Sequence, residues 1–332
     1  MKLNRFTISA ALVLVLSVSA TAQSILPNFG GDRSGTSGFQ FAKIIVDARS
    51  ASMGSSNMAD AFDASSLYWN PALASRMESS EFMAGHTVYF ADINMEYLSY
   101  VQRKGKFAFG ASVQYLNSGD IKETTEFQPF GTGRTFRTIH MNVGLTASHA
   151  ITELFSYGIT VRYLMERIEE VEIKTGAIDF GFFYTVGETG LRFAVGINNF
   201  GLDTSPSGTT IRETTQGNEE VSDFADVSLP TRFNIAAAYD AFENEQNKLV
   251  ITGQITNPSD NSERVGLGVE YGFMKQFFLR SGYEFGREER IIPSFGAGIK
   301  VPFAGRSFSA DYGYTQFDRL GTVHRVALRV AL

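Results

Sequence analysis

The sequence contains no cysteine among its 332 residues. This absence excludes disulfide bonds, thiolate metal sites and a cysteine nucleophile, so stability must come from backbone pairing and packing. Proline is scarce as well, at 8 residues, and no proline-rich or serine-rich linker interrupts the chain after Glu81. One large domain over that stretch is therefore favoured over two domains joined by a linker.

Apolar runs long enough for a membrane-spanning helix are also missing. The most hydrophobic stretch is residues 8–18, which follows Lys2 and Arg5 and precedes the small residues Ala20-Thr21-Ala22. A transmembrane helix needs about 20 apolar residues, and this stretch is too short. A basic start, an apolar middle and a small-residue end predict a secretory signal peptide over residues 1–22, cleaved near Gln23.

Positive charge is in short supply too. The formal net charge is -6, and it includes Lys2 and Arg5, so removal of the signal peptide leaves -6 minus 2, or -8. An acidic chain argues against nucleic acid as a partner.

Catalytic and metal-binding patterns are not evident. No two of the four histidines, His86, His140, His149 and His324, have a spacing typical of metal ligands. His140 and Ser112 on neighbouring strands could serve a hydrolase only with an orienting acid beside them, and surface or lumen histidines are the simpler interpretation. We therefore expect no enzyme activity and no cofactor.

The residues that are abundant favour strands. The chain has 29 Phe, 13 Tyr and 32 Gly, and apolar residues alternate with polar or small ones in a period of two. Residues 263–273 give the clearest example. Their apolar positions are Val265, Leu267, Val269, Tyr271 and Phe273, and these alternate with Arg264, Gly266, Gly268, Glu270 and Gly272.

The same alternation predicts about fourteen strands, each near the ten-residue length that a tilted membrane strand needs. They cover 81–91, 94–103, 106–117, 134–149, 153–167, 174–186, 190–200, 230–241, 248–256, 263–273, 276–285, 292–302, 306–317 and 322–332. The predicted fold class is all-β, an antiparallel transmembrane β-barrel of about 14 strands over residues 81–332. The barrel must close, because an unpaired strand edge in lipid costs several kcal/mol per backbone group.

Soluble β-sandwiches alternate in the same way, and the connections decide between the two. Every second connection is short, at 103–106, 149–153, 186–190, 272–276 and 302–306. The other set is longer and polar, at 117–134, 201–229, 256–263 and 285–292, and only 91–94 breaks the rule. This is the pattern of short periplasmic turns and long extracellular loops, which places residues 201–229 outside the cell.

Residues 23–80 lack this alternation. Glycines lead into two helix-like stretches, at 57–62 and 71–76, and Asn70 before Pro71 fits an N-cap with proline at the first helical position. A barrel of this size has a lumen that must be filled. We expect the segment to fold inside as a plug; the alternative is a periplasmic tail.

The alternation also assigns the two faces of the barrel wall. The lipid-facing set includes Val265, Leu267, Val269, Leu279, Tyr283, Phe308, Tyr312, Val326 and Leu328. Glycines such as Gly268 and Gly298 face the lumen and leave room beside the plug. Charged residues of the lumen face are Arg162, Arg192, Arg264, Glu270, Arg280, Glu284, Asp311, Arg325 and Arg329. We expect them to pair with Asp47, Asp60 or Asp63 of the plug, and the alternative is a selectivity lining for a solute.

The plug segment carries a family resemblance. Residues 47–54 read Asp-Ala-Arg-Ser-Ala-Ser-Met-Gly, and residues 68–72 read Tyr-Trp-Asn-Pro-Ala. These motifs resemble the N-terminal part of the PorV/PorQ family, which is itself similar to the FadL type of fourteen-stranded barrel. The resemblance makes a plug motif of Asp47, Arg49, Met53, Gly54, Asp63, Trp69, Asn70 and Pro71.

The resemblance implies a role in the cell outer membrane. PorV-like proteins accompany the translocon of type IX secretion and receive cargo, and PorQ-like proteins help to hold the surface attachment complex. This implies a non-enzymatic accessory or interaction subunit, with membrane lipid and other secretion or surface-complex proteins as partners. FadL relatives instead pass hydrophobic molecules, so passive transport of a hydrophobic ligand is the alternative function.

Overall fold

The computed structural model describes residue 35 and residues 37–214, 217–287 and 289–332. The predicted signal peptide, residues 1–22, lies outside the described residues. The division of the chain into a signal peptide, a plug segment at 23–80 and a barrel at 81–332 therefore stays a prediction in its boundaries. No helix among the described residues is long and apolar enough to cross a membrane.

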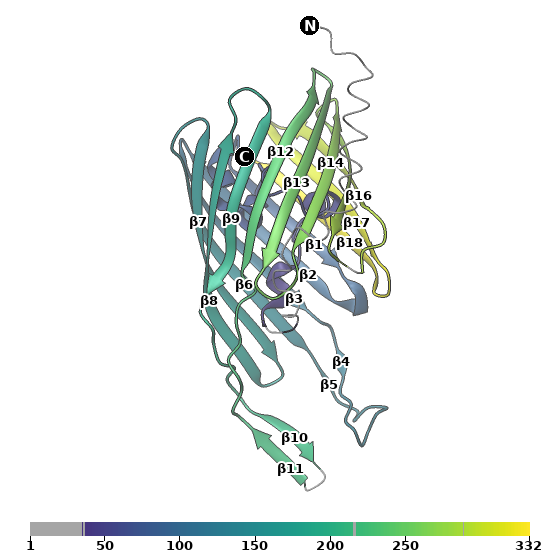
Figure 1. The fold of residues 1–332 in the computed structure, drawn as a ribbon. Coiled ribbons are helices and arrows are strands. Elements are labelled where there is room, and N and C mark those ends of the chain that lie inside the picture. The colour runs from purple at the N-terminus through teal and green to yellow at the C-terminus, as the bar shows by residue number, and fades with distance from the viewer. Residues whose placement is uncertain (1–34, 36, 215–216, 288) are drawn as a thin grey trace, which may run out of the picture.

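Fourteen antiparallel strands close into one barrel (Figure 1). They are β1 (Glu81–Val88), β2 (Asn94–Lys104), β3 (Phe107–Asn117), β6 (Thr138–Ala150), β7 (Phe155–Ile168), β8 (Val171–Thr185), β9 (Leu191–Gly201), β12 (Arg232–Glu243), β13 (Asn247–Pro258), β14 (Arg264–Phe273), β15 (Phe277–Phe285), β16 (Ser294–Phe303), β17 (Arg306–Phe317) and β18 (Gly321–Ala331). The predicted fold class is confirmed, and each predicted strand corresponds to one of these.

The last strand closes the barrel against the first. β1 pairs with β18 in a register that runs from Glu81 opposite Ala331 to Val88 opposite His324. The backbone N–H of Leu332 also donates to the carbonyl of Ser80 at 2.8 Å. Closure leaves no barrel strand with an open edge, which is the condition for a sheet in lipid.

The predicted faces of the wall are correct. The lipid-facing side chains are exposed, apart from Tyr283, which is half-buried and donates its hydroxyl to the carbonyl of Arg290 at 2.7 Å. Neighbouring positions such as Gly268 and Glu270 are buried against the interior. A strand exposes alternate residues to opposite sides, so this wall is apolar outside and polar or small inside.

The connections sort onto two ends, here called the short-turn end and the long-loop end. The short-turn end carries residues 105–106, 151–154, 186–190, 244–246, 274–276 and 304–305. The long-loop end carries residues 118–137 and 202–231, and each of these loops contains a small hairpin (Figure 1). The hairpins are β4 (Ile121–Lys122) with β5 (Thr135–Phe136), and β10 (Thr210–Thr214) with β11 (Gly217–Val221).

Short and long connections alternate less regularly along the chain than predicted. The first hairpin was expected to be the only short connection at the long-loop end, and its loop contains η5 (Phe90–Asp92). Residues 169–170 and 318–320 are short turns at the same end, so that expectation was wrong. Glu169 takes a positive φ of 53°, which lets β7 turn directly into β8.

The segment before β1 fills the barrel (Figure 1). It contains η3 (Gln40–Lys43), α2 (Ala48–Ser52), α3 (Ser66–Trp69) and η4 (Pro71–Arg76). The predicted helix at 71–76 is present as a 3-10 helix, but residues 57–62 form turns, so that helix prediction was wrong. The N–H of Phe62 donates to the carbonyl of Asp60, two residues back, at 3.0 Å, and the same carbonyl accepts Arg49 Nη1 at 2.8 Å.

Candidate functional site: the plugged lumen

Helix α2 and the turn after it lie directly on a wall of glycines. A Cβ atom on Gly268 would sit 2.5 Å from the carbonyl oxygen of Met53, and one on Gly313 would sit 2.7 Å from that of Ala48. Gly54 itself has a φ of +63° and touches the backbone of β15. Only glycine permits backbones to approach so closely, so the glycines bring the plug backbone against the wall.

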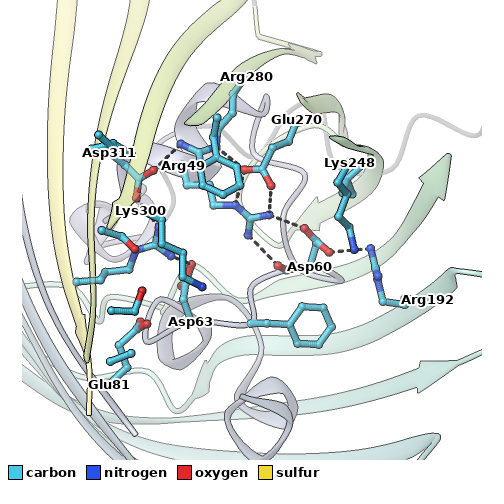
Figure 2. A pocket seen from close by; sticks show the side chains of 18 residues that line it. Arg49, Asp60, Asp63, Glu81, Arg192, Lys248, Glu270, Arg280, Lys300 and Asp311 are labelled. Atoms are coloured by element: carbon cyan, nitrogen blue, oxygen red, sulfur yellow. Dashed lines mark hydrogen bonds and ion pairs between the residues drawn. The ribbon is translucent and has the colours of Figure 1, made fainter. Parts of the chain in front are cut away.

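Arg49 of the plug is the centre of the charge pairing (Figure 2). Its Nε lies 2.8 Å from Glu270 Oε2 on β14, and its Nη2 lies 2.5 Å from Asp60 Oδ2 within the plug. Asp60 also pairs with Arg192 of β9 at 2.8 Å, and Arg192 pairs with Asp240 of β12 at 2.7 Å. Two plug charges thus tie the plug to β14 and β9, and Arg192 extends the pairing to β12.

The pairing continues along the wall to the last strand. Arg280 of β15 pairs with Glu270, and its Nη1 lies 2.6 Å from Asp311 Oδ1 of β17. Arg329 of β18 lies 2.5 Å from the other oxygen of Asp311 and pairs with Asp63 of the plug. Signs alternate along this chain, so each buried charge has an opposite neighbour, as burial of charge requires.

Asp47 does not join the ion pairs, contrary to expectation. Its Oδ2 accepts the backbone N–H of Ser50 at 2.7 Å and so caps α2, while Oδ1 accepts Trp69 Nε1 at 2.9 Å. Capping satisfies the helix N–H groups that lack an intrahelical partner. Asp47 and Trp69 of the plug motif therefore stabilise the plug internally and do not link it to the wall.

Asn70 caps the helix that starts at Pro71, as predicted. Its Oδ1 accepts the N–H of Ala72 at 3.0 Å. Its Nδ2 donates to the carbonyl of Phe182 on β8 at 3.1 Å, and Gly181 leaves the room that the amide occupies. The Asn70 side chain thus caps η4 and also fastens it to the wall at β8.

Three further charges of the lumen face lie towards the long-loop end and do not reach plug acids. Glu284 lies 3.3 Å from Arg287 and 3.6 Å from Arg290. Arg325 donates to the carbonyl of Ile45 and to Thr315, both at 3.3 Å. Arg264 is half-buried and lacks an ion pair or hydrogen bond among the described residues.

One further ion pair fastens the plug at the long-loop end. Lys43 Nζ lies 2.7 Å from Asp260 Oδ2, and Gln40 donates to the same oxygen at 2.6 Å. Burial alone would raise the pKa of Asp260, but the hydrogen bonds from Lys43 and Gln40 hold that pKa below its usual value. The pair is therefore formed at neutral pH and is lost as the pH falls through the lowered pKa of Asp260.

Several cavities lie in or beside the lumen, and two of them bear on whether it is open. One, of about 340 Å³, is lined mainly by charged groups, including Arg49, Lys300 and Glu81 (Figure 2). The other, of about 500 Å³, lies at the long-loop end beside Phe90 and Arg287. The two share no lining residue, and residues 45–75 between their walls are nearly all buried.

The histidines have ordinary partners. His140 lies 3.2 Å from Glu166, and its ring is 5.2 Å from that of Phe41 of the plug at an interplanar angle of 40°. Its side-chain partners are Glu166 and Thr138, and Ser112 is not one of them. Within the described residues, no group of three histidine or acidic side chains is placed to hold a metal ion. Arg162 was expected to pair with a plug acid, but it pairs with Asp179 of β8 at 2.6 Å and reaches the plug only at the carbonyl of Leu67, at 2.9 Å. The plug contacts of His140 and Lys43 were not predictable from sequence, because their partners lie far away in the chain.

Solved structures share this fold. The toluene transporter TbuX of Ralstonia pickettii matches with a TM-score of 0.59 at 12% identity, over 86% of this chain and 97% of its own. The toluene transporter TodX of Pseudomonas putida gives 0.60 at 14%, over 86% and 96%. A FadL homologue of Pseudomonas aeruginosa gives 0.53 at 12%, over 86% and 98%. At such identities the likeness shows the fold alone.

Sequence comparison identifies the family. No curated protein matches the sequence. The family described as type IX secretion system protein PorV matches residues 30–258, which is more than half of the chain and includes the whole described plug. The matched family and the similar structures are secretion-associated or transporter barrels and are not described as enzymes. The chain therefore belongs to the PorV family of type IX secretion system proteins and is an outer-membrane β-barrel.

Proposed function

We propose that this chain is a non-enzymatic accessory subunit of a type IX secretion or surface-assembly complex, and that its lumen stays closed. The observation that carries the proposal is the plug: its charges Arg49, Asp60 and Asp63 are all paired to the wall. Moving the plug aside would leave buried charges on both surfaces without partners, at a cost of roughly 3–5 kcal/mol for each broken pair.

The cavities also favour a closed lumen. A site for a hydrophobic molecule is lined mainly by apolar side chains with a few polar ones. The cavity beside Arg49 is the reverse: 11 of its 18 lining residues are Arg, Lys, Asp or Glu, and Phe62 and Phe278 are its aromatic members. A hydrophobic solute there would displace water from ionic groups without offering them hydrogen bonds.

The long-loop end has the character of a binding face. Phe130 and Leu202 are 90% and 83% exposed on the two longest loops, and Ile211 is exposed on the β10–β11 hairpin. Large apolar side chains exposed on these loops are available for contact with other proteins. On this proposal, partner proteins of the secretion machinery contact these loops.

Transport of a hydrophobic molecule is the second candidate, and the fold shared with two toluene transporters favours it. A transporter would need the plug to move or a passage to open through the wall. The ion pairs of the plug oppose the first of these routes.

Two measurements on the same wild-type protein separate the candidates. Affinity purification from gently solubilised outer membranes of the native host should recover other type IX components. Liposomes that contain the purified barrel should take up toluene no faster than liposomes without protein. Toluene uptake well above this background, together with recovery of the barrel alone, would refute the proposed function in favour of transport.

A further inference from the structure

The mouth of the lumen at the long-loop end holds the cavity of about 500 Å³, here called the mouth cavity. It is enclosed by the connections β1–β2, β13–β14, β15–β16 and β17–β18, together with Arg264 of β14 and Phe317 of β17. Its lining includes no residue of the described plug segment. Sites for small molecules have volumes of about 300–1,000 Å³, so the mouth cavity has the size of a binding site.

One cation of the mouth cavity has no partner. Arg264 is half-buried and forms no ion pair or hydrogen bond with the described residues. The two carboxylates that act on it most strongly are Glu284 and Asp260, and both are already paired with other cations. A partly buried charge without a counter-charge is unfavourable, so Arg264 lacks an anion that the barrel does not supply.

Other arginines crowd the same place. The like charges that act most strongly on Arg264 are Arg287, which lines the mouth cavity with it, and Arg232 of β12. Arg290 is buried beside Glu284, and within the described part of the chain its Nε has no hydrogen-bond partner. Cations held together repel one another, and an anion placed among them would relieve that repulsion.

Neutral donors complete the polar side of the lining. Asn261 uses its Oδ1 to accept the backbone N–H of Ser262 at 2.8 Å, while its Nδ2 and the hydroxyl of Ser262 have no acceptor among the described residues. Glu289 is the one acidic residue of the described lining, and it accepts the backbone N–H of Arg319 at 3.4 Å. Two arginines and two neutral donors against one carboxylate favour an anionic ligand.

Aromatic rings form much of the remaining lining. The rings of Tyr89 and Phe90 are 4.4 Å apart, and those of Phe90 and Phe317 are 6.3 Å apart. They offer an apolar surface to the uncharged part of a ligand, while the polar groups fix its orientation. A long acyl chain would need a mainly apolar cavity, but 5 of the 10 lining residues are Asn, Ser, Arg or Glu.

We infer that the mouth cavity binds a phosphorylated sugar, with its phosphate on Arg264 and Arg287 and its ring against Tyr89, Phe90 and Phe317. A phosphate group carries a charge of about −1.5 to −2 at pH 7 and three acceptor oxygens, so it can engage two guanidinium groups at once. A carboxylate carries one charge and would leave one arginine short. The inference goes beyond the proposed function and does not depend on it, because the mouth cavity lies apart from the plug.

Calorimetric titration of the purified, detergent-solubilised chain with glucose 6-phosphate tests the chemistry. Saturable binding is expected, with a Kd below about 1 mM. Glucose should not bind, and glucuronate should bind at least about tenfold more weakly. Absence of saturable binding by glucose 6-phosphate would mean that water alone solvates Arg264, and would overturn the inference. Glucuronate binding as tightly, or octanoate binding in its place, would refute the phosphate chemistry.

The variant Arg264→Met tests the residue. Binding of glucose 6-phosphate should weaken at least about tenfold, because hydrogen bonds to a charged group are lost. The matched control is Arg319→Met, which removes an exposed arginine at the same end of the barrel but outside the lining, and it should bind as wild type does.

Unfolding by denaturant separates a binding role of Arg264 from a structural one. Without ligand, Arg264→Met should unfold at a denaturant concentration equal to or higher than wild type, since no partner is left behind. Glucose 6-phosphate should raise the midpoint of wild type and leave that of the variant unchanged. A variant less stable than wild type without ligand would make Arg264 a structural residue, and the inference would fail.

Competition identifies the source of the phosphate. Displacement of glucose 6-phosphate by lipopolysaccharide, but not by the dephosphorylated lipid, would assign the mouth cavity to a lipid headgroup; displacement by neither would assign it to a soluble sugar phosphate. Equal displacement by both would overturn the phosphate assignment. Arg264→Met should still recover type IX components as wild type does, so failure of this inference and failure of the proposed function are seen in different measurements.

Discussion

Arg49 is the residue on which the charge balance of the lumen depends most. It belongs to the plug, yet its guanidinium lies between Glu270 of the wall and Asp60 of its own segment, and its side chain is almost buried. An arginine suits this place because its planar group donates in several directions at once. Glu270 needs it, since its other cation, Arg280, is shared with Asp311.

Replacing Arg49 by methionine should loosen the plug without preventing barrel assembly. The change leaves Glu270 and Asp60 short of a cation and should lower the local free energy of opening by about 3 kcal/mol, the range for breaking a buried ion pair. Hydrogen exchange over residues 45–63 measures this. Arg137→Met, which breaks an exposed pair with Asp120, is the control and should have no effect on that segment.

The double variant Arg49→Met/Glu270→Gln gives an internal check on the Arg49 prediction. Removing the carboxylate that lost its partner should recover part of the protection. Equal exchange in wild type and Arg49→Met would show that the ion pair contributes nothing to plug stability.

Asn70 gives a prediction of smaller size. Asn70→Ala removes an N-cap, which costs about 1 kcal/mol, together with a hydrogen bond to the wall at Phe182. Residues 66–76 should exchange faster while the barrel strands stay protected. Asn257→Ala, at an exposed position on β13, is the matched control. Unchanged exchange over 66–76 would remove the anchoring role from Asn70.

At the scale of elements, α2 and the turn after it lie in close contact with the glycines of the wall. Gly268→Ala should push Met53 and the turn after α2 away from β14, because the added methyl group would lie 2.5 Å from a carbonyl oxygen. Gly253→Ala on neighbouring β13 is the matched control, since its Cβ would meet only Leu267 Cδ2 at 3.5 Å.

The two glycine variants should differ in the hydrogen exchange of α2. We expect Gly268→Ala to fold as a barrel, shown by unchanged heat-dependent gel mobility, but the amides of α2 should exchange much faster than in wild type. Gly253→Ala should match wild type in both measurements. Protection of α2 in Gly268→Ala equal to that in Gly253→Ala would contradict the close approach described here.

The elements also show what the sequence could and could not reveal. The barrel strands were predictable because lipid on one side and a packed lumen on the other impose a period of two over about ten residues. The hairpins β4–β5 and β10–β11 were missed because they lie in polar loops, where no face is buried and no alternation is imposed. The helix expected at 57–62 is replaced by tight turns, in which the N–H groups of Asp60 and Phe62 bond three and two residues back, to Asn57 and Asp60, instead of four.

Among the site residues, local chemistry was the predictable part. The N-cap role of Asn70 was predictable from the following Pro71, because an N-cap depends only on residues that are neighbours in the sequence. Asp47 looked like an ion-pair partner, but three residues later lies the Ser50 N–H that it caps instead. Which lumen arginine meets which plug acid depends on how β9, β14 and β18 are arranged around the barrel, and one sequence does not encode that arrangement in a readable pattern.

At the scale of the whole molecule, the orientation in the membrane remains to be tested. The chain has no cysteine, so a single cysteine gives a unique label. If the long-loop end faces outward, Phe130→Cys should react with a membrane-impermeant maleimide on intact cells. Lys275→Cys, in the turn between β14 and β15, should react only after the outer membrane is permeabilised. The reverse result would invert the topology.

The order of the plug's partners along the chain bears on how the protein assembles. The plug comes first in the sequence, but Arg49 pairs with β14 and Asp63 pairs with β18, the strand that completes the barrel. Until those late strands are in place, the early segment carries ionised groups without their counterparts. Neutralisation of the plug and closure of the seam are therefore one event. An assembly intermediate halted before β18 should be open to proteases at residues 45–63, and the finished protein should resist them there.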